Sequence, residues 1–487
     1  MFFSVDRHSN ISIQEQLRTK IVAAVLDGQL LPGALLPSTR GLAKNLSVSR
    51  TTVVSVYEKL AEDGFLVAKD RSGFCVNPDA KPLRGMSEKP EVSIDEGRIK
   101  SPINWSARYK LRPSEQRNIR KPKDWQTYKY PFVFGQSDPT LFPLAAWREC
   151  SRQAMSELAM REWSADAIAE DEPHLVQEIK SKLLPRRGIY ADDSEILITS
   201  GAQNALFLVA SLLMDKNTVV GMEEPGYPDA RNIFAIQGAE IHPMQIDAEG
   251  AELPDASALC DYFFLTPSHQ SSTTVTLSAS RRKEFLNAAA IRDCVIIEDD
   301  FESETNYLGA PVPAMKSEDK EGRIIYVGSL SKSMFPGLRL GYIVANSKFI
   351  EELRSFRRLV LRHAPSNNQR TASLFIAQGF HDTYIRKLNR IYLERWQTMR
   401  DSLDRYLPGM SISPTFGGTS FWLEGPEGID SEKIAADALK QGIVIEPGLP
   451  HFQNPENKKH FFRLGFSSIS KDRIPEGLRL LSLILGK

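Results

Sequence analysis

After Tyr130, short and almost continuously apolar runs alternate with stretches of helical pattern. A strand with one solvated face alternates apolar and polar residues, so continuous runs are typical of strands buried on both faces. The pattern therefore predicts an α/β fold of three layers, in which helices cover both sides of a mostly parallel sheet. The runs are Glu195–Ile198, Val219–Gly221, Tyr262–Leu265, Cys294–Ile297 and Ile324–Val327.

Polar motifs follow three of these runs, at the strand ends where sheets of this class place their ligands. Thr199–Leu206 enters a helix through small residues, either as an ordinary turn or as a phosphate-binding helix N-terminus. Glu298–Phe301 places the carboxylate of Asp299 at a second strand end. That carboxylate could cap a helix, bind a metal or keep a pyridine nitrogen protonated.

The third motif, Ser329–Tyr342, carries Lys332 in a small turn that is rich in hydroxyl groups, and Arg339 and an apolar strand follow it. Such a lysine can bond the aldehyde of pyridoxal 5′-phosphate (PLP), while nearby hydroxyls and an arginine hold the phosphate. The motif therefore predicts a PLP site.

Two further residues become candidate ligand contacts when they are considered together with these three motifs. Tyr227, within Glu223–Pro228, could stack on a flat ring. Arg463, on the short strand Phe462–Ser467, could bind a carboxylate through two parallel hydrogen bonds. Taken alone, the tyrosine would be core packing and the arginine a surface charge.

The first eighty residues have a purely helical pattern followed by a hairpin pattern. Apolar residues at helical spacing extend over Ile13–Leu30, Ser38 can cap a second helix, and a third helix runs from Ser49 to Gly64. Two apolar runs joined by a polar turn then occupy residues 65–76. Three helices and a hairpin predict an α/β winged helix-turn-helix.

Such a domain presents the start of its third helix to the major groove of DNA, and here that start is Ser49, Arg50, Thr51 and Thr52. Lys plus Arg and Asp plus Glu each total 61 in the 487-residue chain, so the positive charge that DNA requires must be local. A small helical domain with solvated charges is the alternative. The cationic residues of this region are Arg40, Lys44, Arg50, Lys59, Lys69 and Arg71.

Residues 79–125 are rich in Lys, Arg, Glu, Pro and Ser, a composition typical of a flexible connector. We therefore expect three parts. A DNA-binding domain occupies residues 1–78, a linker residues 79–125, and an aminotransferase-like, PLP-binding domain residues 126–487.

Four scattered cysteines, Cys75, Cys150, Cys260 and Cys294, lack the spacing of a metal site and are typical of a reduced, cytoplasmic protein. The N-terminus lacks the pattern of a signal peptide, and the apolar tail at residues 478–485 is too short to span a bilayer. We expect no metal and no membrane association.

The motifs Leu36–Ala43, Val48–Val53, Tyr57–Leu60 and Gly64–Leu66 resemble, in order and spacing, the DNA-binding domain of the GntR family. The later motifs resemble a fold-type I aminotransferase, which has a three-layer core and a smaller α+β lobe. Together they resemble the MocR subfamily of GntR transcriptional regulators, in which the two are fused.

The resemblance implies a role for each candidate residue. Lys332 would bond PLP, Asp299 would pair with the pyridine nitrogen, Tyr227 would stack on the ring, and Arg463 would bind the carboxylate of an effector. The implied phosphate ligands are Ser200, Gly201, Ala202, Ser329, Ser331 and Arg339. The implied DNA contacts are Arg40, Ser49, Arg50, Thr52 and Gly73.

Three positions depart from the family pattern. Phe301 stands where the family has a tyrosine whose hydroxyl meets the ring oxygen, Ser272–Thr274 replaces a Pro-Thr-Gly turn, and Gly418–Ser420 lacks a histidine. Fewer contacts to the ring argue against efficient transamination but not against Schiff-base formation.

The resemblance implies a PLP-dependent transcriptional regulator without net catalysis. Such a protein would form a head-to-tail homodimer and bind operator DNA. It would sense an amino compound as an external aldimine. Segments 117–126, 134–136 and 147–150 are similar to regulators beside taurine and ectoine utilisation genes, so taurine or an ectoine-derived amino acid is the implied effector. Two alternatives stay open. The chain could be a PLP-dependent aminotransferase with an accessory DNA-binding domain, or a PLP store without specific DNA sites.

Overall fold

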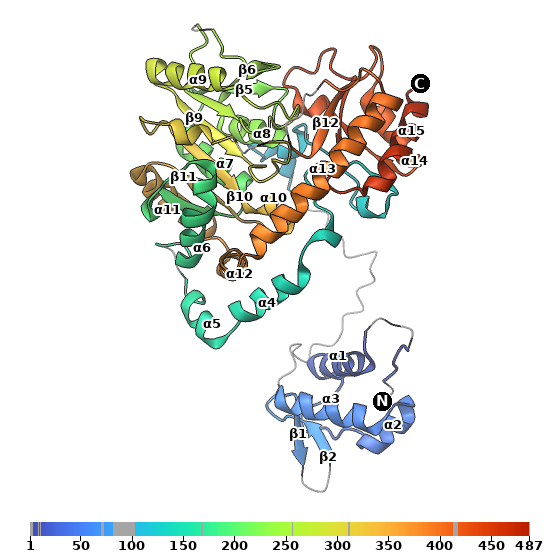
Figure 1. The fold of residues 1–487 in the computed structure, drawn as a ribbon. Helices are drawn as coiled ribbons and strands as arrows, with labels where there is room; N and C mark the ends of the chain where they lie inside the picture. The colour runs from blue at the N-terminus through green and yellow to red at the C-terminus, as the bar shows by residue number, and fades with distance from the viewer. Residues whose placement is uncertain are drawn as a thin grey trace. The chain divides into compact units, whose positions relative to one another are not determined.

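The chain forms two compact units, residues 1–108 and residues 109–487 (Figure 1). We refer to the first as the head and to the second as the body. The computed structural model describes residues 3–7, 9, 11–69, 73–80, 103–166, 169–255, 257–309, 312–412 and 417–486.

The head is a winged helix-turn-helix, as the sequence predicts. Its first helix ends at Leu26 and not at Leu30, because Asp27 caps the helix and Gly28 then adopts a positive φ of 72°. Strands β1 and β2 pair antiparallel and form the wing. The elements are α1 (Ile13–Leu26), α2 (Thr39–Leu46), α3 (Arg50–Glu62), β1 (Leu66–Lys69) and β2 (Gly73–Val76).

Each helix of the head begins after a serine whose side chain satisfies a free backbone N–H group of the first turn. Ser12, Ser38 and Ser49 accept hydrogen bonds from the third residue beyond each of them. The helices then pack apolar faces together, and the hydroxyl of the fully buried Tyr57 donates to the carbonyl of Pro37 at 3.1 Å. The head therefore has a core of its own.

An eight-stranded sheet forms the centre of the body, in the order β4-β11-β10-β9-β8-β5-β6-β7. Strands β6, β5, β8, β9 and β10 are parallel, whereas β11 pairs antiparallel with both β10 and β4, and β7 pairs antiparallel with β6. All five apolar runs are strands of this sheet. Its strands are β4 (Ile196–Thr199), β5 (Val219–Glu224), β6 (Glu240–Asp247), β7 (Gly250–Ala251), β8 (Tyr262–Leu265), β9 (Val295–Asp300), β10 (Ile324–Ser329) and β11 (Gly341–Val344).

Helices cover both faces of this sheet, which makes the predicted three layers (Figure 1). Helices α7, α8 and α11 pack on one face, around Ile325 and Val327 of β10. Helices α4, α6, α9 and α12 pack on the other face, on the side of Ile324 and Tyr326. The helices of this region are α4 (Leu144–Ala154), α5 (Glu157–Trp163), α6 (Pro173–Glu178), α7 (Ala202–Leu213), α8 (Pro228–Gln237), α9 (Ala279–Arg292), α10 (Leu330–Ser333), α11 (Ser347–Leu361) and α12 (Ser366–Ala377).

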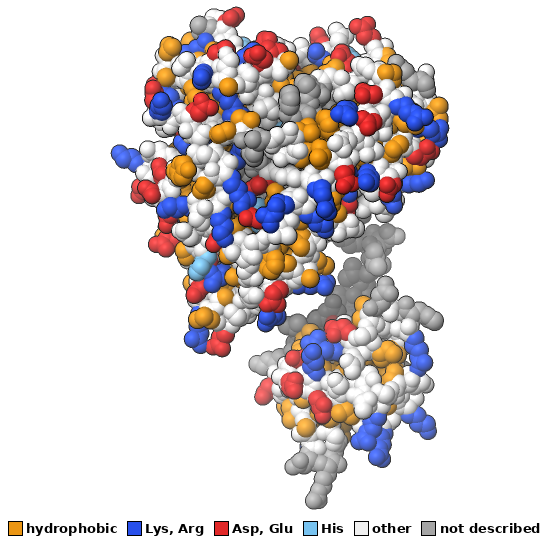
Figure 2. Space-filling view, in the orientation of Figure 1, with side chains coloured by type: hydrophobic (Ala, Val, Ile, Leu, Met, Phe, Trp, Pro, Cys, Tyr) orange, Lys and Arg blue, Asp and Glu red, His pale blue; other side chains and the backbone are white. Residues whose placement is uncertain are grey.

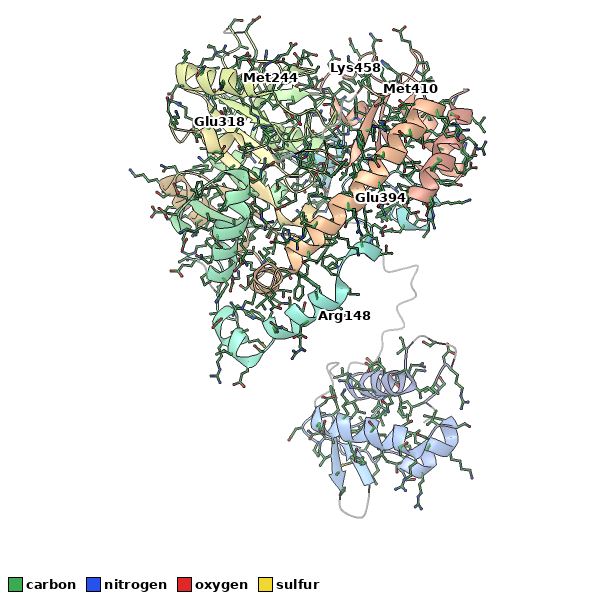
Figure 3. The ribbon with its side chains drawn as sticks, viewed as in Figure 1. Arg148, Met244, Glu318, Glu394, Met410 and Lys458 are labelled. Carbon is green, nitrogen blue, oxygen red and sulfur yellow. The ribbon has the colours of Figure 1, made fainter. Side chains whose placement is uncertain are left out.

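A smaller α+β lobe completes the body and has a separate core. Met410 lies in that core and Met244 in a core of the large sheet, and Figure 3 labels both side chains. Strands β12, β15 and β14 form an antiparallel sheet in that order, and β3 pairs with β13. The lobe contains α13 (Phe380–Tyr406), α14 (Ser431–Lys440), α15 (Ile474–Ile484), β3 (Tyr130–Pro131), β12 (Ser420–Glu424), β13 (Ile443–Val444), β14 (Glu446–Pro447) and β15 (Phe461–Gly465).

The later part of the segment that composition assigns to a linker packs on the body. Trp125 is only 7% exposed and lies in an apolar cluster with Val133 and Val444. One buried indole outweighs the polar composition of its neighbours because it removes a large apolar surface from water. None of the described helices has both the length and the apolar composition needed to cross a membrane.

A buried ion pair joins α11 to the end of the sheet. The carboxylate of Asp171 contacts Arg357, and it accepts hydrogen bonds from Arg354 and from the backbone N–H of Ile198, each at 3.2 Å. Arg357 is fully buried and also donates to the carbonyl of Ile198 at 2.6 Å. Arg357 therefore depends on Asp171 for its counter-charge.

We expect Asp171→Ala to destabilise the body by about 3–5 kcal/mol, because it leaves the buried Arg357 unpaired. Differential scanning calorimetry of the full chain measures the effect as a lower Tm. Glu476→Ala, which removes an exposed ion pair with Arg479, is the control and should leave Tm unchanged. Equal Tm values for the two variants would contradict the prediction.

Candidate functional site

A cavity of about 340 Å³ lies in the body where β9 and β10 end and α7 begins. Because the carboxyl ends of parallel strands meet at one edge of the sheet, motifs far apart in sequence reach this cavity together. Of the predicted site residues, the cavity wall contains Ala202, Tyr227, Asp299, Ser329, Ser331, Lys332, Arg339 and Arg463.

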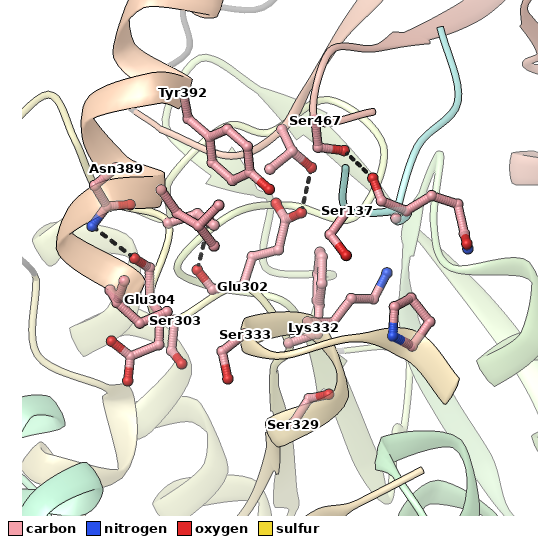
Figure 4. A pocket seen from close by; sticks show the side chains of 18 residues that line it. Ser137, Glu302, Ser303, Glu304, Ser329, Lys332, Ser333, Asn389, Tyr392 and Ser467 are labelled. Carbon is pink, nitrogen blue, oxygen red and sulfur yellow. Dashed lines mark hydrogen bonds between the residues drawn. The ribbon is translucent and has the colours of Figure 1, made fainter. Parts of the chain in front are cut away.

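Lys332 projects from α10 into the site, beside the buried carboxylate of Glu302 (Figure 4). Its Nζ lies 4.8 Å from the ring centre of Phe134 and 5.7 Å from that of Phe301. Desolvation lowers the pKa of Lys332, and the charge of Glu302 opposes that shift in part. A lowered pKa favours the neutral amine, which is the nucleophilic form.

Gly135 makes room for the lysine. It has a φ of +68°, and a Cβ atom at this position would lie 2.6 Å from the Nζ of Lys332. Both facts favour glycine here. The sequence offered no spacing that would connect two residues so far apart along the chain.

Asp299 is 3% exposed, and its Oδ1 atom has no hydrogen-bond partner among the described residues. Burial, and then the neighbouring Asp300, raise the pKa of Asp299 to about 7. A buried acceptor without a donor is costly. A protonated ring nitrogen would supply the missing donor and the missing positive charge.

The start of α7 forms a cradle with Arg339. Gly201 has a φ of +87°, and no side chain of the described residues caps the helix after it, which leaves the first N–H groups of α7 open to a ligand. The Nη2 of Arg339 donates to the carbonyl of Ser200 at 3.2 Å. Free N–H groups beside a guanidinium suit a phosphate.

Ser331 and Tyr227 also face this region. The hydroxyl of Ser331 donates to the carbonyl of Leu340 at 3.1 Å and accepts from its N–H at 3.0 Å, which fixes the turn around Lys332. Tyr227 is half-buried, and its hydroxyl donates to Asp229 at 3.2 Å. Its ring therefore has a fixed place in the cavity wall.

Arg463 is fully buried and already has a counter-charge. Its Nε donates to Oε1 of Glu446 at 2.7 Å, and its Nη1 donates to the carbonyl of Ser271 at 2.6 Å. Burial raises the pKa of Glu446, but Arg463 and His451 together outweigh burial and lower that pKa to about 2. Sequence reasoning missed Glu446, because a single glutamate on a short strand has no distinctive pattern.

Two of the residues that depart from the family pattern, Phe301 and Ser272, contact other residues near the site. Phe301 meets the ring of Phe134 edge-on, with 6.3 Å between ring centres. The hydroxyl of Ser272 lies 2.8 Å from Nδ1 of His451, whose Nε2 lies 3.1 Å from Glu446. The altered turn is therefore linked to the counter-charge of the arginine.

In the head, Lys and Arg side chains gather over the part that holds α2 (Figure 2). Arg40, Arg50 and Thr51 are exposed, whereas Thr52 is half-buried. Ser49 is exposed too, but its hydroxyl also caps α3 by accepting from the N–H of Thr52 at 3.1 Å. Gly73 opens β2 of the wing with a φ of +88°.

The body holds a donor set that fits PLP. Lys332, with its lowered pKa, matches the aldehyde of PLP. The carboxylate oxygen of Asp299, which lacks a donor among the described residues, matches the ring nitrogen. The N-terminus of α7 beside Arg339 matches the phosphate. The same fit is what the sequence motifs predict.

Each of the two units matches a known protein family. Residues 13–76 match the bacterial regulatory proteins of the gntR family, and residues 132–481 match the class I and II aminotransferases. The chain is 38% identical to the HTH-type transcriptional regulator TauR of Rhodobacter capsulatus, over 97% of this chain and 96% of that protein. It is 29% identical to the probable rhizopine catabolism regulatory protein MocR of Rhizobium meliloti, over 98% of this chain and 94% of that protein.

The fold of the body is similar to that of the kynurenine aminotransferase of Pyrococcus horikoshii, solved in complex with PMP. The TM-score is 0.71 and the identity 26%, over 78% of this chain and 98% of that chain. An aminotransferase fold of this class implies PLP binding. Since both matches lie on one chain in the order of the full-length relatives, the chain belongs to the MocR subfamily of GntR transcriptional regulators.

Proposed function

We propose that this protein is a PLP-dependent transcriptional regulator whose body senses an amino compound and whose head binds operator DNA. The observation that carries the proposal is Lys332, a desolvated amine in a cavity that also holds a carboxylate oxygen without a donor. The same chain has a winged helix-turn-helix with an exposed Arg50 at the start of α3.

The residues around Lys332 have separable roles in this proposal. PLP supplies an aldehyde carbon that bonds reversibly to one primary amine at a time, so an effector amine competes with Lys332 for it. The start of α7 and Arg339 hold the phosphate, Tyr227 covers the ring, and Asp299 keeps the ring nitrogen protonated. Phe134 and Phe301 keep water from the lysine amine.

An effector acts on DNA binding only if it binds one conformation of the body more tightly than another. A tenfold preference is worth about 1.4 kcal/mol. We propose a head-to-tail homodimer, because paired heads would then read two half-sites whose separation the linker sets. Taurine or an ectoine-derived amino acid is the effector that the likeness to related regulators favours.

A second candidate function is an aminotransferase with an accessory head, and the intact Lys332 and Asp299 favour it. Phe301 argues against it, because a phenyl ring offers no hydroxyl to the oxygen of the cofactor ring. A regulator requires only reversible amine exchange, for which that hydroxyl is less important.

The direct test is binding of the PLP-loaded protein to the DNA upstream of its own gene, at fixed salt, against a scrambled duplex. A footprint on the upstream DNA alone is the expected result. Equal binding to both duplexes, together with turnover of an amino donor and a keto acid, would contradict the regulator hypothesis and favour the aminotransferase.

Arg50→Ala should weaken that binding by about 1–3 kcal/mol, because it removes a cation from the helix that enters the major groove. Fluorescence anisotropy with a labelled operator measures the change, and the cofactor absorbance should stay constant. Arg405→Ala, an exposed arginine on α13, is the matched control. Similar losses in both variants would assign the effect to net charge and contradict a specific contact.

Lys332→Ala should abolish the visible absorbance of covalently held PLP and leave the head folded, because the two units have separate cores. Absorption spectra and circular dichroism check the two parts. The variant should still bind the operator but no longer respond to amines. Loss of DNA binding through unfolding would contradict the modular organisation.

Asp299 should make the cofactor-free protein less stable as pH rises. Its folded pKa of about 7 lies above the ordinary aspartate pKa of 3.8, so the stability it contributes is present in acid and is lost as pH rises from about 4 through 7. Asp299→Asn should therefore raise the free energy of unfolding at pH 8, by on the order of 4 kcal/mol at most, and by less at pH 5, and Tm should rise with it. Thermal unfolding at the two pH values checks the sign.

In the PLP-loaded protein the effect of Asp299→Asn should reverse, because the ring nitrogen loses its carboxylate. A stabilising effect that persists in the loaded protein would contradict the role assigned to Asp299. A variant with the same Tm as the native chain at pH 8 would contradict the raised pKa.

A further inference from the structure

The first residues of the body carry an unusual excess of positive charge. Residues 109–129, which we call the basic segment, contain seven Lys and Arg against two Asp and Glu, a net charge of +5. Residues 1–78, which include the winged helix-turn-helix, contain nine Lys and Arg against seven Asp and Glu, a net charge of +2. The whole chain is neutral. The basic segment is therefore more positive than the DNA-binding domain itself.

The weak net charge of the head limits its attraction to DNA. Anions beside a cation cancel part of its field, so net charge sets the attraction beyond direct contact. Arg18 pairs with Asp63 at 2.9 Å, and Arg7 and Lys20 donate to backbone carbonyls of the head. A large share of the affinity of proteins for DNA comes from cations that neutralise phosphates. A second cationic surface on the same chain would therefore add to that affinity.

Three cations of the basic segment are exposed and have no counter-charge. Lys110, Arg120 and Lys123 form no hydrogen bond or ion pair with any other residue that the structure describes. Arg112, by contrast, pairs with Glu115 at 3.2 Å. The three side chains are therefore available to an anionic partner.

The basic segment is fixed on the body at two points. Near its middle, Gln116 donates to the carbonyl of Asn232 on α8 at 3.2 Å, and Arg117 donates to the carbonyl of Gln453 at 2.6 Å. Near its end, Trp125 is buried in an apolar cluster. Cations on a fixed backbone lose less conformational entropy on binding than cations on a free chain. The segment is therefore a preformed surface and not only a run of charge.

The basic segment follows the head closely along the chain. Lys110 comes 34 residues after Val76, the last residue of β2. A fully extended chain spans at most about 3.5 Å per residue, so the two lie no more than about 120 Å apart, the length of about 35 base pairs. A head bound to DNA therefore raises the local concentration of DNA phosphates around the segment.

We infer that the basic segment binds the phosphate backbone of the DNA that flanks the operator, through Lys110, Arg120 and Lys123. The inference rests on the proposed function, since the head has to bind the operator first. It adds to the head a second contact, made by the body. Phosphate contacts position a protein on DNA and carry no sequence information, so this contact is the same for every flanking sequence.

Two duplexes and two triple variants provide the test. The short duplex covers only the footprint of the heads, and the long duplex adds about 35 base pairs on each side. Lys110→Gln, Arg120→Gln and Lys123→Gln are combined in the full-length, PLP-loaded protein. The matched control combines Lys283→Gln, Lys348→Gln and Arg405→Gln, which remove three exposed cations from α9, α11 and α13. Fluorescence anisotropy over a salt series gives Kd for each pair.

The native chain should bind the long duplex more tightly than the short one, and a change of the flanking sequence should leave Kd unchanged. The triple variant of the basic segment should weaken binding to the long duplex about tenfold. The slope of log K against log salt should fall by about 3, since each phosphate contact contributes about 0.9. Binding to the short duplex should not change. The control variant should bind both duplexes as the native chain does.

A charge-preserving variant separates backbone attraction from base readout. Lys110→Arg, Arg120→Lys and Lys123→Arg together should keep the native Kd, because a phosphate is attracted by either cation. Circular dichroism and the cofactor absorbance check that each variant is folded and loaded. A tenfold loss in the charge-preserving variant would overturn a contact with the backbone.

Other results would overturn the inference and leave the regulator intact. Equal binding of the native chain to both duplexes would show that the body does not contact the flanks, and the segment would be a solvated surface. Equal losses in the basic-segment and control variants would assign the effect to the net charge of the body. An equal loss on the short duplex would place the effect within the operator. If the native chain does not prefer the upstream DNA at all, the proposed function fails and the inference fails with it.

Discussion

The register between β9 and β10 is the constraint on which the site depends. The strands are parallel, and Val327 lies opposite Asp299. The turn that carries Lys332 begins a few residues later, so the carboxylate and the amine reach the same cavity from neighbouring strands. A shift of one residue would turn Asp299 to the other face of the sheet.

Three consecutive carboxylates end β9, and their surroundings give them different roles. Glu298 accepts hydrogen bonds from the backbone N–H groups of Met315 and Lys316, each at 2.8 Å. Asp300 accepts from Arg187 and from the hydroxyl of Tyr326, also at 2.8 Å each. The protein thus provides partners for the outer two, and the central Asp299 accepts no hydrogen bond within the described residues. Its open oxygen is what the sequence motif could suggest but not demonstrate.

Local sequence patterns predicted the elements whose structure is determined by residues close to one another in the sequence. The apolar runs gave the strands, and serines at helix starts, such as Ser38, gave the helices of the head. The turn around Lys332 was recognisable because its chemistry is contained in one short segment. The end of the first helix was misplaced by four residues, since apolar spacing continues to Leu30 after the hydrogen bonding of the helix has ended at Leu26.

Contacts between distant segments could not be predicted in the same way. Gly135 meets Lys332 because the small lobe folds against the large sheet, whereas Glu446 meets Arg463 because β14 pairs antiparallel with β15 within the lobe. Neither glycine nor glutamate differs in its sequence neighbourhood from many others in the chain. Arg463 was predicted to bind the carboxylate of an effector, and the structure adds that Glu446 pairs with it.

That partner changes what an aminotransferase-like site can do. A buried ion pair adds little stability, because desolvation of both charges offsets their attraction. It can nevertheless add specificity, because any ligand acid at Arg463 has to face Glu446 as well. Phe301 likewise differs from the family pattern, since its phenyl ring offers no hydroxyl to the site around Lys332.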